Sequence, residues 1–379
     1  MNNYEALIAL PDVVFAETDA AKTEQSILTL YEGITKTVLY PGDPVRVFLT
    51  TLSAVINQQK VIINETGRQN LLRYAKGIAL DHLGSPVGVY RLKASAAGTE
   101  MEFFIQAALL FPVVVPAGTR ITADGKVYFQ TDTEVSIQPG EVSVTVSATC
   151  LSTGANHNGL SVGEINRLVD QLSYVTKVTN TIESSGGSDT EKDEPFRARI
   201  ALAPESFNTT GPVLAYIFHA LSAHPDIADV SITRPVAGTV QVNILLKNGI
   251  IPQPDGPEVK AVEALLNPEK KRPLNDTVLV RPGTAISIDY TLTWYISSSQ
   301  RAFVKDISKQ IADAVAEYET WQTSVLGRDV ISDDLIQRCR EAGAKRVAIS
   351  GLNYRKLDKT EVCEFVFNPN RILYGGEED

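Results

Sequence analysis

The sequence contains few residues of the kinds that bind transition metals. Among its 379 residues are three cysteines and four histidines. The cysteines form no CxxC pair and the histidines form no HxxxH pair, which are spacings typical of zinc sites. Phosphate-loop and dinucleotide-binding glycine motifs are also missing. Each cysteine continues an apolar pattern, which predicts a buried free thiol at Cys150, Cys339 and Cys363. We therefore expect neither a metal ion nor a cofactor.

Positive charge and long apolar runs are also scarce. The chain has 35 Lys and Arg against 45 Asp and Glu, a formal net charge of −10 at pH 7. Nucleic-acid binding needs a basic face, and the one basic cluster, Lys270-Lys271-Arg272, fits a solvated loop. No apolar run approaches the roughly 20 residues that span a bilayer. The N-terminus lacks the basic start of a signal peptide. We expect no nucleic acid, no membrane and a cytoplasmic site of synthesis.

Amphipathic helices are predicted over residues 1–95. One covers Thr23 to Thr37 and another covers Gln69 to Leu83. Between them, Asp43 can cap a helix whose first turn holds Pro44. Its apolar residues recur at helical spacing and form a candidate inter-subunit helix: Val45, Phe48, Leu49, Leu52, Val55 and Ile56. Such a face packs either on helices of the same chain or on another subunit, and the sequence leaves both open.

A change of texture predicts a small antiparallel β domain over residues 96–183. Short apolar runs are separated by turn signals such as Asp124-Gly125 and Pro139-Gly140. Val142 to Cys150 alternates apolar and polar residues, as a half-buried strand does.

Mixed patterns follow and predict two α+β domains, over residues 184–281 and 282–379. Gly211-Pro212 is predicted to open a helix in the first. A long alternating strand, Thr284 to Ile296, begins the second. The tail from Gly375 to Asp379 is expected to be disordered. The predicted fold class is therefore α+β multidomain: an N-terminal helical segment, a small antiparallel β domain and two α+β domains.

Acids and arginines are concentrated from Ser184 to Ile200. A calcium loop counted from Asp189 would need glycine where Glu194 stands, and acids in one flexible stretch do not make a rigid glycosidase pair. A hinge, a helix cap and a first helical turn fit better. Two glycines permit a sharp turn, Thr190 and Asp193 resemble a capping box, and acids precede an arginine at ion-pair spacing. The predicted hinge and cap residues are Gly186, Gly187, Asp189, Thr190, Glu191, Asp193, Glu194 and Arg197.

One further pattern suggests catalysis but fits poorly. Gly159 to Gly163 matches G-x-S-x-G, yet a polar turn precedes it where a nucleophile elbow needs a buried strand. We therefore predict no catalytic residue.

Two stretches resemble the baseplate J-like family of contractile phage tails. The first carries the family's pattern of glycines, asparagines, acids and arginines at Gly154, Asn156 or Asn158, Gly163, Ile165, Val178, Asn180, Gly186, Gly187, Asp189, Glu191, Glu194, Arg197 and Arg199. In the second, Lys271 to Val278 resembles the family's Arg-Pro-x-x-Asp-x-Val. The similarity runs through most of the chain. Pro195 departs from the pattern and leaves the start of the following helix open.

This resemblance implies a structural protein of the baseplate wedge and no enzyme. Such proteins pair with copies of themselves and with other wedge proteins. They form a ring around the hub, near the sheath-initiating proteins, and couple baseplate rearrangement to sheath contraction. The implied location is the baseplate of a phage, a tailocin or a related particle, which assembles in the bacterial cytoplasm and is released by lysis. A hinge at the two glycines would predict that Gly187→Val blocks assembly or firing while the domains stay folded.

Two alternatives come from other classes of protein. A tail-associated cell-wall hydrolase would use Glu191 or Asp193 and would lose turnover when these become amides. A receptor-binding module would use the β domain and would bind a cell envelope directly and saturably.

Overall fold

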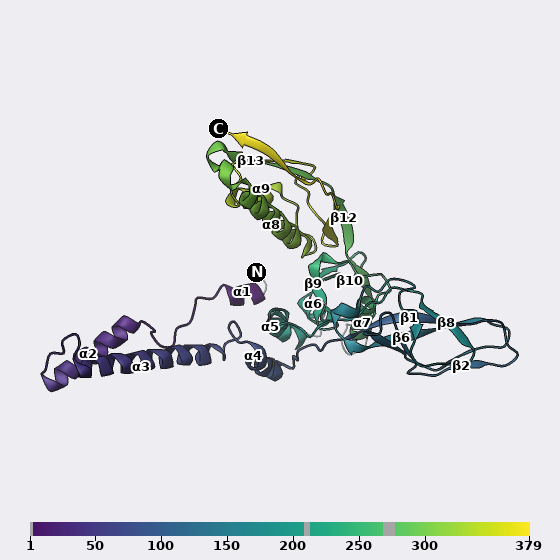
Figure 1. Cartoon of the computed structure of the whole chain (residues 1–379), viewed down its shortest axis with the longest axis horizontal. Helices are drawn as coiled ribbons and strands as arrows, with labels where there is room; N and C mark the ends of the chain where they lie inside the picture. The colour runs from purple at the N-terminus through teal and green to yellow at the C-terminus, as the bar shows by residue number, and fades with distance from the viewer. Residues whose placement is uncertain (1–2, 208–212, 268–276) are drawn as a thin grey trace. The chain divides into compact units, whose positions relative to one another are not determined.

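The computed structural model describes residues 3–207, 213–267 and 277–379 (Figure 1). The chain forms two compact units, and each is made of two segments. Unit 1 comprises Met1–Arg91 and Lys192–Pro204, and unit 2 comprises Leu92–Glu191 and Glu205–Asp379. The chain therefore leaves unit 1 after Arg91, returns to it at Lys192 and leaves it again after Pro204.

Unit 1 is helical. Its elements are α1 (Asn3–Ile8), α2 (Ala20–Thr35), α3 (Pro44–Arg68), α4 (Gly77–Gly84), η1 (Ser85–Val87) and α5 (Asp193–Leu202). The predicted cap of the second helix is confirmed, because the Asp43 carboxylate accepts the Val45 N–H at 2.8 Å and Pro44 begins α3. The expected helix from Gln69 is wrong at its start. The carbonyls of Leu72 and Ala75 accept hydrogen bonds from Arg197, so they are not engaged in a helical turn.

The first part of unit 2 is a nearly closed antiparallel sheet. Six strands follow the order β7-β3-β4-β6-β1-β8, and β2 pairs with β5 beside them. These strands are β1 (Ala96–Ile105), β2 (Val113–Val115), β3 (Arg120–Thr122), β4 (Tyr128–Thr131), β5 (Val135–Ile137), β6 (Ser143–Thr153), β7 (Arg167–Leu168) and β8 (Val175–Asn180), with η2 (Ala155–His157) after β6. Alternate residues of the long strands face inward, and Met101, Phe103, Phe129 and Val146 fill the centre. We call this part the barrel.

A three-stranded sheet with two helices follows the barrel. Its order is β11-β10-β9, with β10 antiparallel to β9 and parallel to β11. The elements are η3 (Ala203–Phe207), α6 (Val213–Leu221), β9 (Ile227–Thr233), β10 (Thr239–Leu246), η4 (Lys247–Gly249), α7 (Pro257–Leu266) and β11 (Thr277–Pro282). The predicted helix start at Gly211-Pro212, the basic cluster and most of the Lys271 to Val278 motif lie outside the described residues.

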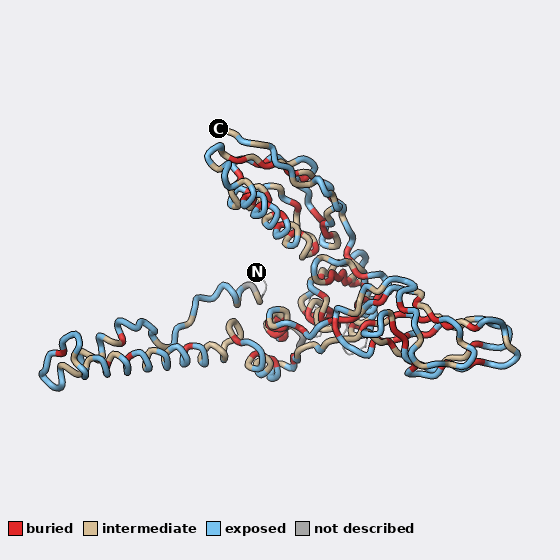
Figure 2. The backbone as a smooth tube through the Cα atoms, viewed as in Figure 1, coloured by how far each residue is buried: buried red, intermediate tan, exposed pale blue. Residues whose placement is uncertain are grey.

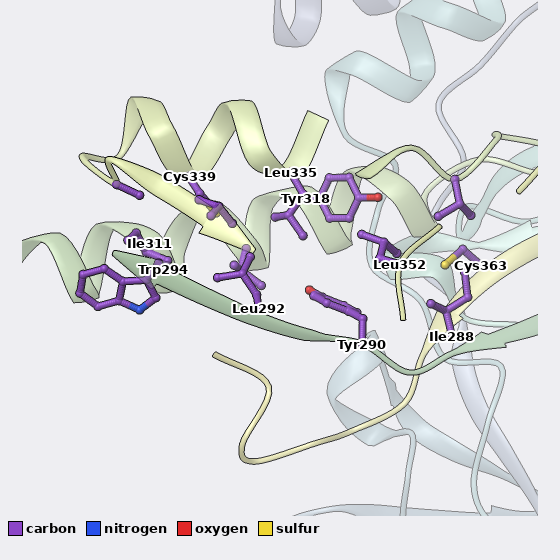
Figure 3. Packing of buried hydrophobic residues seen from close by; sticks show 14 of the residues in the cluster. Ile288, Tyr290, Leu292, Trp294, Ile311, Tyr318, Leu335, Cys339, Leu352 and Cys363 are labelled. Atoms are coloured by element: carbon purple, nitrogen blue, oxygen red, sulfur yellow. The ribbon is translucent and has the colours of Figure 1, made fainter. Parts of the chain in front are cut away.

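The C-terminal part packs two helices against a three-stranded mixed sheet and a two-stranded parallel sheet. Its elements are β12 (Thr284–Ile288), β13 (Thr291–Ser297), η5 (Ser298–Phe303), α8 (Val304–Thr323), α9 (Ser332–Glu341), β14 (Arg346–Ser350), β15 (Glu361–Phe365) and β16 (Ile372–Glu378). Figure 3 shows Tyr290, Leu292 and Trp294 pointing from the sheet toward Ile311 and Tyr318 of α8. The expectation of a disordered tail is wrong, because β16 pairs with β13 and Glu378 forms an ion pair with Arg346.

The predicted fold class is confirmed, since helices come first, an antiparallel sheet domain second and α+β elements last. The three cysteines are buried free thiols, as expected. Burial raises the pKa of Cys363 to about 12 and that of Cys339 to about 11. The three boundaries between the four predicted domains stay a prediction. In the part of the chain that the structure describes, no helix is both long and apolar enough to cross a bilayer.

Candidate functional site: the α3 stripe and the segment 154–199

The predicted apolar face of α3 is exposed instead of packed inside the chain. Phe48 is 66% exposed, and Val45, Leu52 and Val55 are exposed as well, whereas Leu49 is buried at 9%. Figure 2 shows α2 and α3 as almost wholly exposed or half-buried, in contrast to the buried strands of the barrel. Of the two alternatives that the sequence leaves open, internal packing therefore accounts for Leu49 and in part for Ile56, which is half-buried.

The contact between α2 and α3 is largely polar, which explains this exposure. Thr23 of α2 and Ser53 of α3 are buried. Lys60 Nζ donates to Thr23 Oγ1 at 2.9 Å, and Thr50 Oγ1 donates to Glu24 Oε1 at 3.0 Å. Hydroxyl and charged groups thus take part in the contact between the helices, and many of the apolar side chains of α3 are left exposed.

The exposed apolar residues of α3 follow a seven-residue repeat. Val45 and Leu52 are seven apart, as are Phe48, Val55 and Ile62, and the two series are offset by three and four residues. All five side chains are exposed. This is the a/d spacing with which one helix packs against another in a coiled coil. We call these five residues the α3 stripe; their role as an inter-subunit surface stays a prediction.

The two predicted hinge glycines are fixed within the barrel. Gly186 has a φ of +83°, which glycine adopts without strain. Gly187 is extended and buried, and a Cβ there would lie 2.6 Å from the Gly154 carbonyl oxygen. On either side, Ser188 and Ser185 exchange backbone hydrogen bonds with Ser95 and Gly98. The positive φ of Gly186 and the close packing around Gly187 therefore explain why glycine occupies these positions. Their role as a hinge stays a prediction.

The predicted capping box is wrong. Helix α5 begins at Asp193 after Lys192, and no side chain caps it. Thr190 is exposed, and the Asp193 carboxylate instead accepts the Gly77 N–H at 3.1 Å and pairs with Arg91 at 2.8 Å. Burial alone would raise the pKa of Asp193, but the Gly77 N–H and the Arg91 guanidinium together lower it. The acid serves unit 1 as a tertiary contact and not as a local cap.

The remaining acids and arginines of the stretch also make structural contacts. Glu194 forms the predicted ion pair with Arg197 and accepts from the Tyr4 hydroxyl, and both partners hold its pKa below the ordinary value. Arg197 is buried and donates to the carbonyls of Leu72 and Ala75. Arg199 is buried too and donates to the Tyr90 carbonyl at 2.7 Å. Sequence reasoning found the ion pair but not these carbonyl contacts.

In unit 2, Glu191 joins the two ends of the barrel segment. Its backbone N–H donates to the Leu92 carbonyl at 3.0 Å, and its carboxylate accepts the Leu92 N–H at 3.0 Å. Asp189, two residues earlier, is exposed and accepts the Ala155 N–H at 3.2 Å. Glu191 is thus held as a buried backbone partner, which is an unfavourable state for an acid that must exchange protons.

Asn180, which the sequence marks only as a motif residue, connects the two edges of the barrel sheet, β7 and β8, which do not pair with each other. It is fully buried, and Oδ1 accepts the Ile165 N–H at 3.0 Å. Its Nδ2 donates to the carbonyls of Ser161 and Ile182. Gly163 has a φ of +84° and donates its N–H to the Asn180 carbonyl. These motif residues bind the loop before β7 to the end of β8.

The Ser95 and His224 side chains are in contact, but the contact lacks the chemistry of a catalytic pair. The Ser95 Oγ lies 3.4 Å from His224 Nε2. His224 Nδ1 accepts the Asp226 N–H at 3.3 Å, so in the neutral ring the proton is on Nε2. A general base needs that nitrogen unprotonated. No group of His, Cys, Asp and Glu in the described residues is arranged to hold a metal ion.

Comparison with known proteins gives matches along the same segments. Residues 93–187 match the family model of the baseplate J-like protein barrel domain, and residues 208–282 match that of the baseplate J-like central domain. Baseplate protein J of Escherichia phage P2 is 29% identical over 165 residues, which are 42% of this chain. The match covers 52% of that relative, about half its length.

A solved structure also resembles the chain. It is the cryo-EM structure of the anti-feeding prophage (AFP) baseplate, 6-fold symmetrised, with 13% identity and a TM-score of 0.44. The similarity covers 91% of this chain and 90% of that one.

Proposed function

Because the chain carries the barrel and central domains of the baseplate J-like family, we propose that it is a structural component of the baseplate of a phage tail or tail-like particle. The observation that carries the proposal is the presence of both family domains in consecutive order, over residues 93–187 and 208–282. A part made for assembly needs surfaces more than it needs a reaction site. The candidate hydrolase residues fit this role, because Glu191 and Asp193 are engaged by backbone amides.

Within the baseplate, the chain is a wedge protein that pairs with copies of itself and with other wedge proteins. The α3 stripe supports this finer proposal. An exposed apolar heptad seam gains free energy only when another helix covers it. The wedges form a ring around the hub, near the sheath-initiating proteins, and rearrangement of the ring is coupled to sheath contraction.

Quantitative mass spectrometry of purified contractile particles from the source organism tests the proposal. Peptides of this chain are counted against peptides of the sheath protein. We expect a fixed copy number that is a multiple of the particle's rotational symmetry. Absence from the particles, or trace amounts that vary between preparations, would contradict a built-in structural role and would favour the hydrolase or receptor-binding alternatives.

A further inference from the structure

The end of the barrel at which β1 finishes and β6 and β8 begin carries an exposed apolar surface. It consists of the loop 106–112, the turn 138–142 and the segment 171–175, which we call the barrel tip. Leu110 is 97% exposed and Tyr174 is 58% exposed, and Phe111 and Val142 are exposed beside them. These residues are on the opposite end of β1 from Ser95, where the barrel contacts His224.

The barrel tip is built on a small core of its own. Ile105, Val113 and Ile137 are buried together beneath it, and Leu109 packs against them. The Gly140 N–H donates to the Leu109 carbonyl at 3.1 Å, which joins the turn to the loop. The exposed side chains are therefore presented from fixed backbone, which lowers the entropy that binding must overcome.

Tyr174 is exposed but has a backbone conformation that is unfavourable for a bulky residue. Its φ is +69°, in the left-handed region that bulky residues avoid. Its ring meets Phe111 edge-to-face, with centroids 5.4 Å apart and an interplanar angle of 71°. Such strain concentrates at functional positions. Here it holds an aromatic pair beside Leu110, and aromatic side chains are the usual anchors of protein interfaces.

The charges of the barrel tip indicate what could cover it. Glu141 is the one acidic or basic residue (Asp, Glu, Lys, Arg or His) in its three segments. The neighbouring Lys177 has its ammonium 5.4 Å from the Phe104 ring centroid. Attraction to anionic lipid needs basic residues, which the segments lack. A symmetric contact between two tips would bring Glu141 carboxylates together in an apolar interface, at a cost in free energy.

We propose that the barrel tip docks into another protein of the same particle, in an apolar, uncharged recess with a basic residue at its rim that meets Glu141. This inference rests on the proposed baseplate role. Leu110, Phe111 and Tyr174 are the anchors. Water is removed from their apolar surface on docking, which is the main favourable term.

Photo-cross-linking in assembled particles tests the proposal. Particles carry p-benzoylphenylalanine in place of Leu110 or, as a control, in place of Val236, an exposed residue between β9 and β10. Cross-linked peptides are identified by mass spectrometry. We expect position 110 to label one other protein of the particle, at apolar residues near Lys or Arg, and position 236 not to label the same peptide.

Tyr174→Gly separates docking from folding. Glycine relieves the positive φ and removes the ring, so the purified variant should unfold at or above the wild-type denaturant midpoint. We expect it, like Phe111→Asp, to lower the yield of the cross-link at position 110 at least tenfold. Unchanged cross-linking in Tyr174→Gly particles would overturn the proposal.

Other outcomes are equally decisive. If the chain is present in particles at fixed copy number but position 110 labels only lipid, only a second copy of this chain, or nothing, the docking proposal is wrong and the baseplate role stands. If the chain is absent from particles, the baseplate role fails and the docking proposal fails with it.

Discussion

At the scale of single residues, buried residues of the motif make tertiary contacts that stabilise the barrel. The sequence pattern does not reveal these contacts. Asn180 and Gly187 both belong to the motif that resembles the baseplate J-like family. The pattern located them, but except for Ile182 the hydrogen-bond partners named here are 15 or more residues away, such as Ile165 for Asn180 and Asn158 for Gly187. No local periodicity encodes such contacts, so the sequence identified the residues and missed their roles.

Replacing Asn180 by alanine should destabilise the barrel. The change leaves the Ile165 N–H and the carbonyls of Ser161 and Ile182 without their partner in a buried site. We expect a loss of about 2–4 kcal/mol in the free energy of unfolding, measured by chemical denaturation. Asn166→Ala is the matched control, because that side chain makes one exposed hydrogen bond, to the Gly163 carbonyl. Equal stability of the two variants would contradict the assigned role.

Gly187→Ala should also destabilise the barrel, and not act through a hinge. A Cβ at Gly187 would lie 2.6 Å from the Gly154 carbonyl oxygen and 2.8 Å from Asn158 Oδ1. The expected loss is about 1–3 kcal/mol. Gly98→Ala is the control, since its nearest neighbour would be 3.8 Å away. If denaturation shows no difference, the packing account is wrong. Gly187→Val would therefore impair the fold itself, which makes it an unsuitable test of hinge motion.

At the scale of elements, the sequence predicted α3 and its cap but not the partner of its apolar face. The helical spacing and the Asp43-Pro44 start are local signals, and both are confirmed. Whether the apolar face of α3 is buried inside the chain depends on which side chains of α2 contact α3. Thr23 and Glu24 of α2 make hydrogen bonds to polar side chains of α3. A polar contact of this kind has no sequence signature that separates it from a solvated helix face.

Phe48→Asp should weaken self-association of the chain. A charge in the centre of the α3 stripe must be desolvated when another helix covers it. We expect at least tenfold weaker association in sedimentation velocity experiments. Ile78→Asp is the control, because Ile78 is exposed on α4 outside the stripe. If both variants associate like the wild type, the stripe is not the self-association surface.

The contact between β9 and the loop after α8 should depend on pH. Asp229 Oδ2 accepts the Leu326 N–H at 2.7 Å, and burial raises the pKa of this carboxyl despite that bond and Arg328. The folded chain thus binds the proton more tightly than the unfolded chain. This contribution to stability is fully present below the ordinary pKa of 3.8 and is lost as pH rises through the raised value.

Asp229→Asn isolates this effect, because asparagine does not titrate. The stability of the wild type relative to the variant should fall as pH rises from below 3.8 through the raised pKa. Chemical denaturation at a series of pH values measures the difference, and NMR titration of the Asp229 carboxyl gives its pKa directly. A pKa below 3.8 would mean that Arg328 and the amide bonds outweigh burial.

At the scale of the whole molecule, the chain crosses between its units three times, at Arg91/Leu92, at Glu191/Lys192 and at Pro204/Glu205. The sequence predicts domain boundaries at 95/96 and 183/184, because composition and texture change there, and these boundaries stay a prediction. It assigned α5 to the third domain, whereas the structure groups Lys192–Pro204 with the N-terminal helices. From chain order alone, α5 would be grouped with the residues that follow it. The partners of Arg197, more than 100 residues earlier, are not visible in it.

This discontinuity predicts that residues 1–91 cannot complete unit 1 without α5. Phe196 is fully buried and lies against Gly84, and Arg197 and Arg199 bind the carbonyls of Leu72, Ala75 and Tyr90. A fragment of residues 1–91 would expose these carbonyls and this core. A short Gly-Ser linker from Arg91 to Lys192 should restore both, because Arg91 and Asp193 are within ion-pair distance.

Hydrogen exchange of the two fragments decides the point. We expect the Gly77 and Val89 amides to be protected only when 192–204 is linked, since Gly77 donates to Asp193 and Val89 donates to the Gly84 carbonyl beside Phe196. The amides of α3 serve as the internal control, because that helix closes its own hydrogen bonds. Arg197→Ala in the linked fragment should reproduce much of the loss. Equal protection of Gly77 and Val89 in both fragments would mean that α5 is an attachment to unit 1 and not a part of its fold.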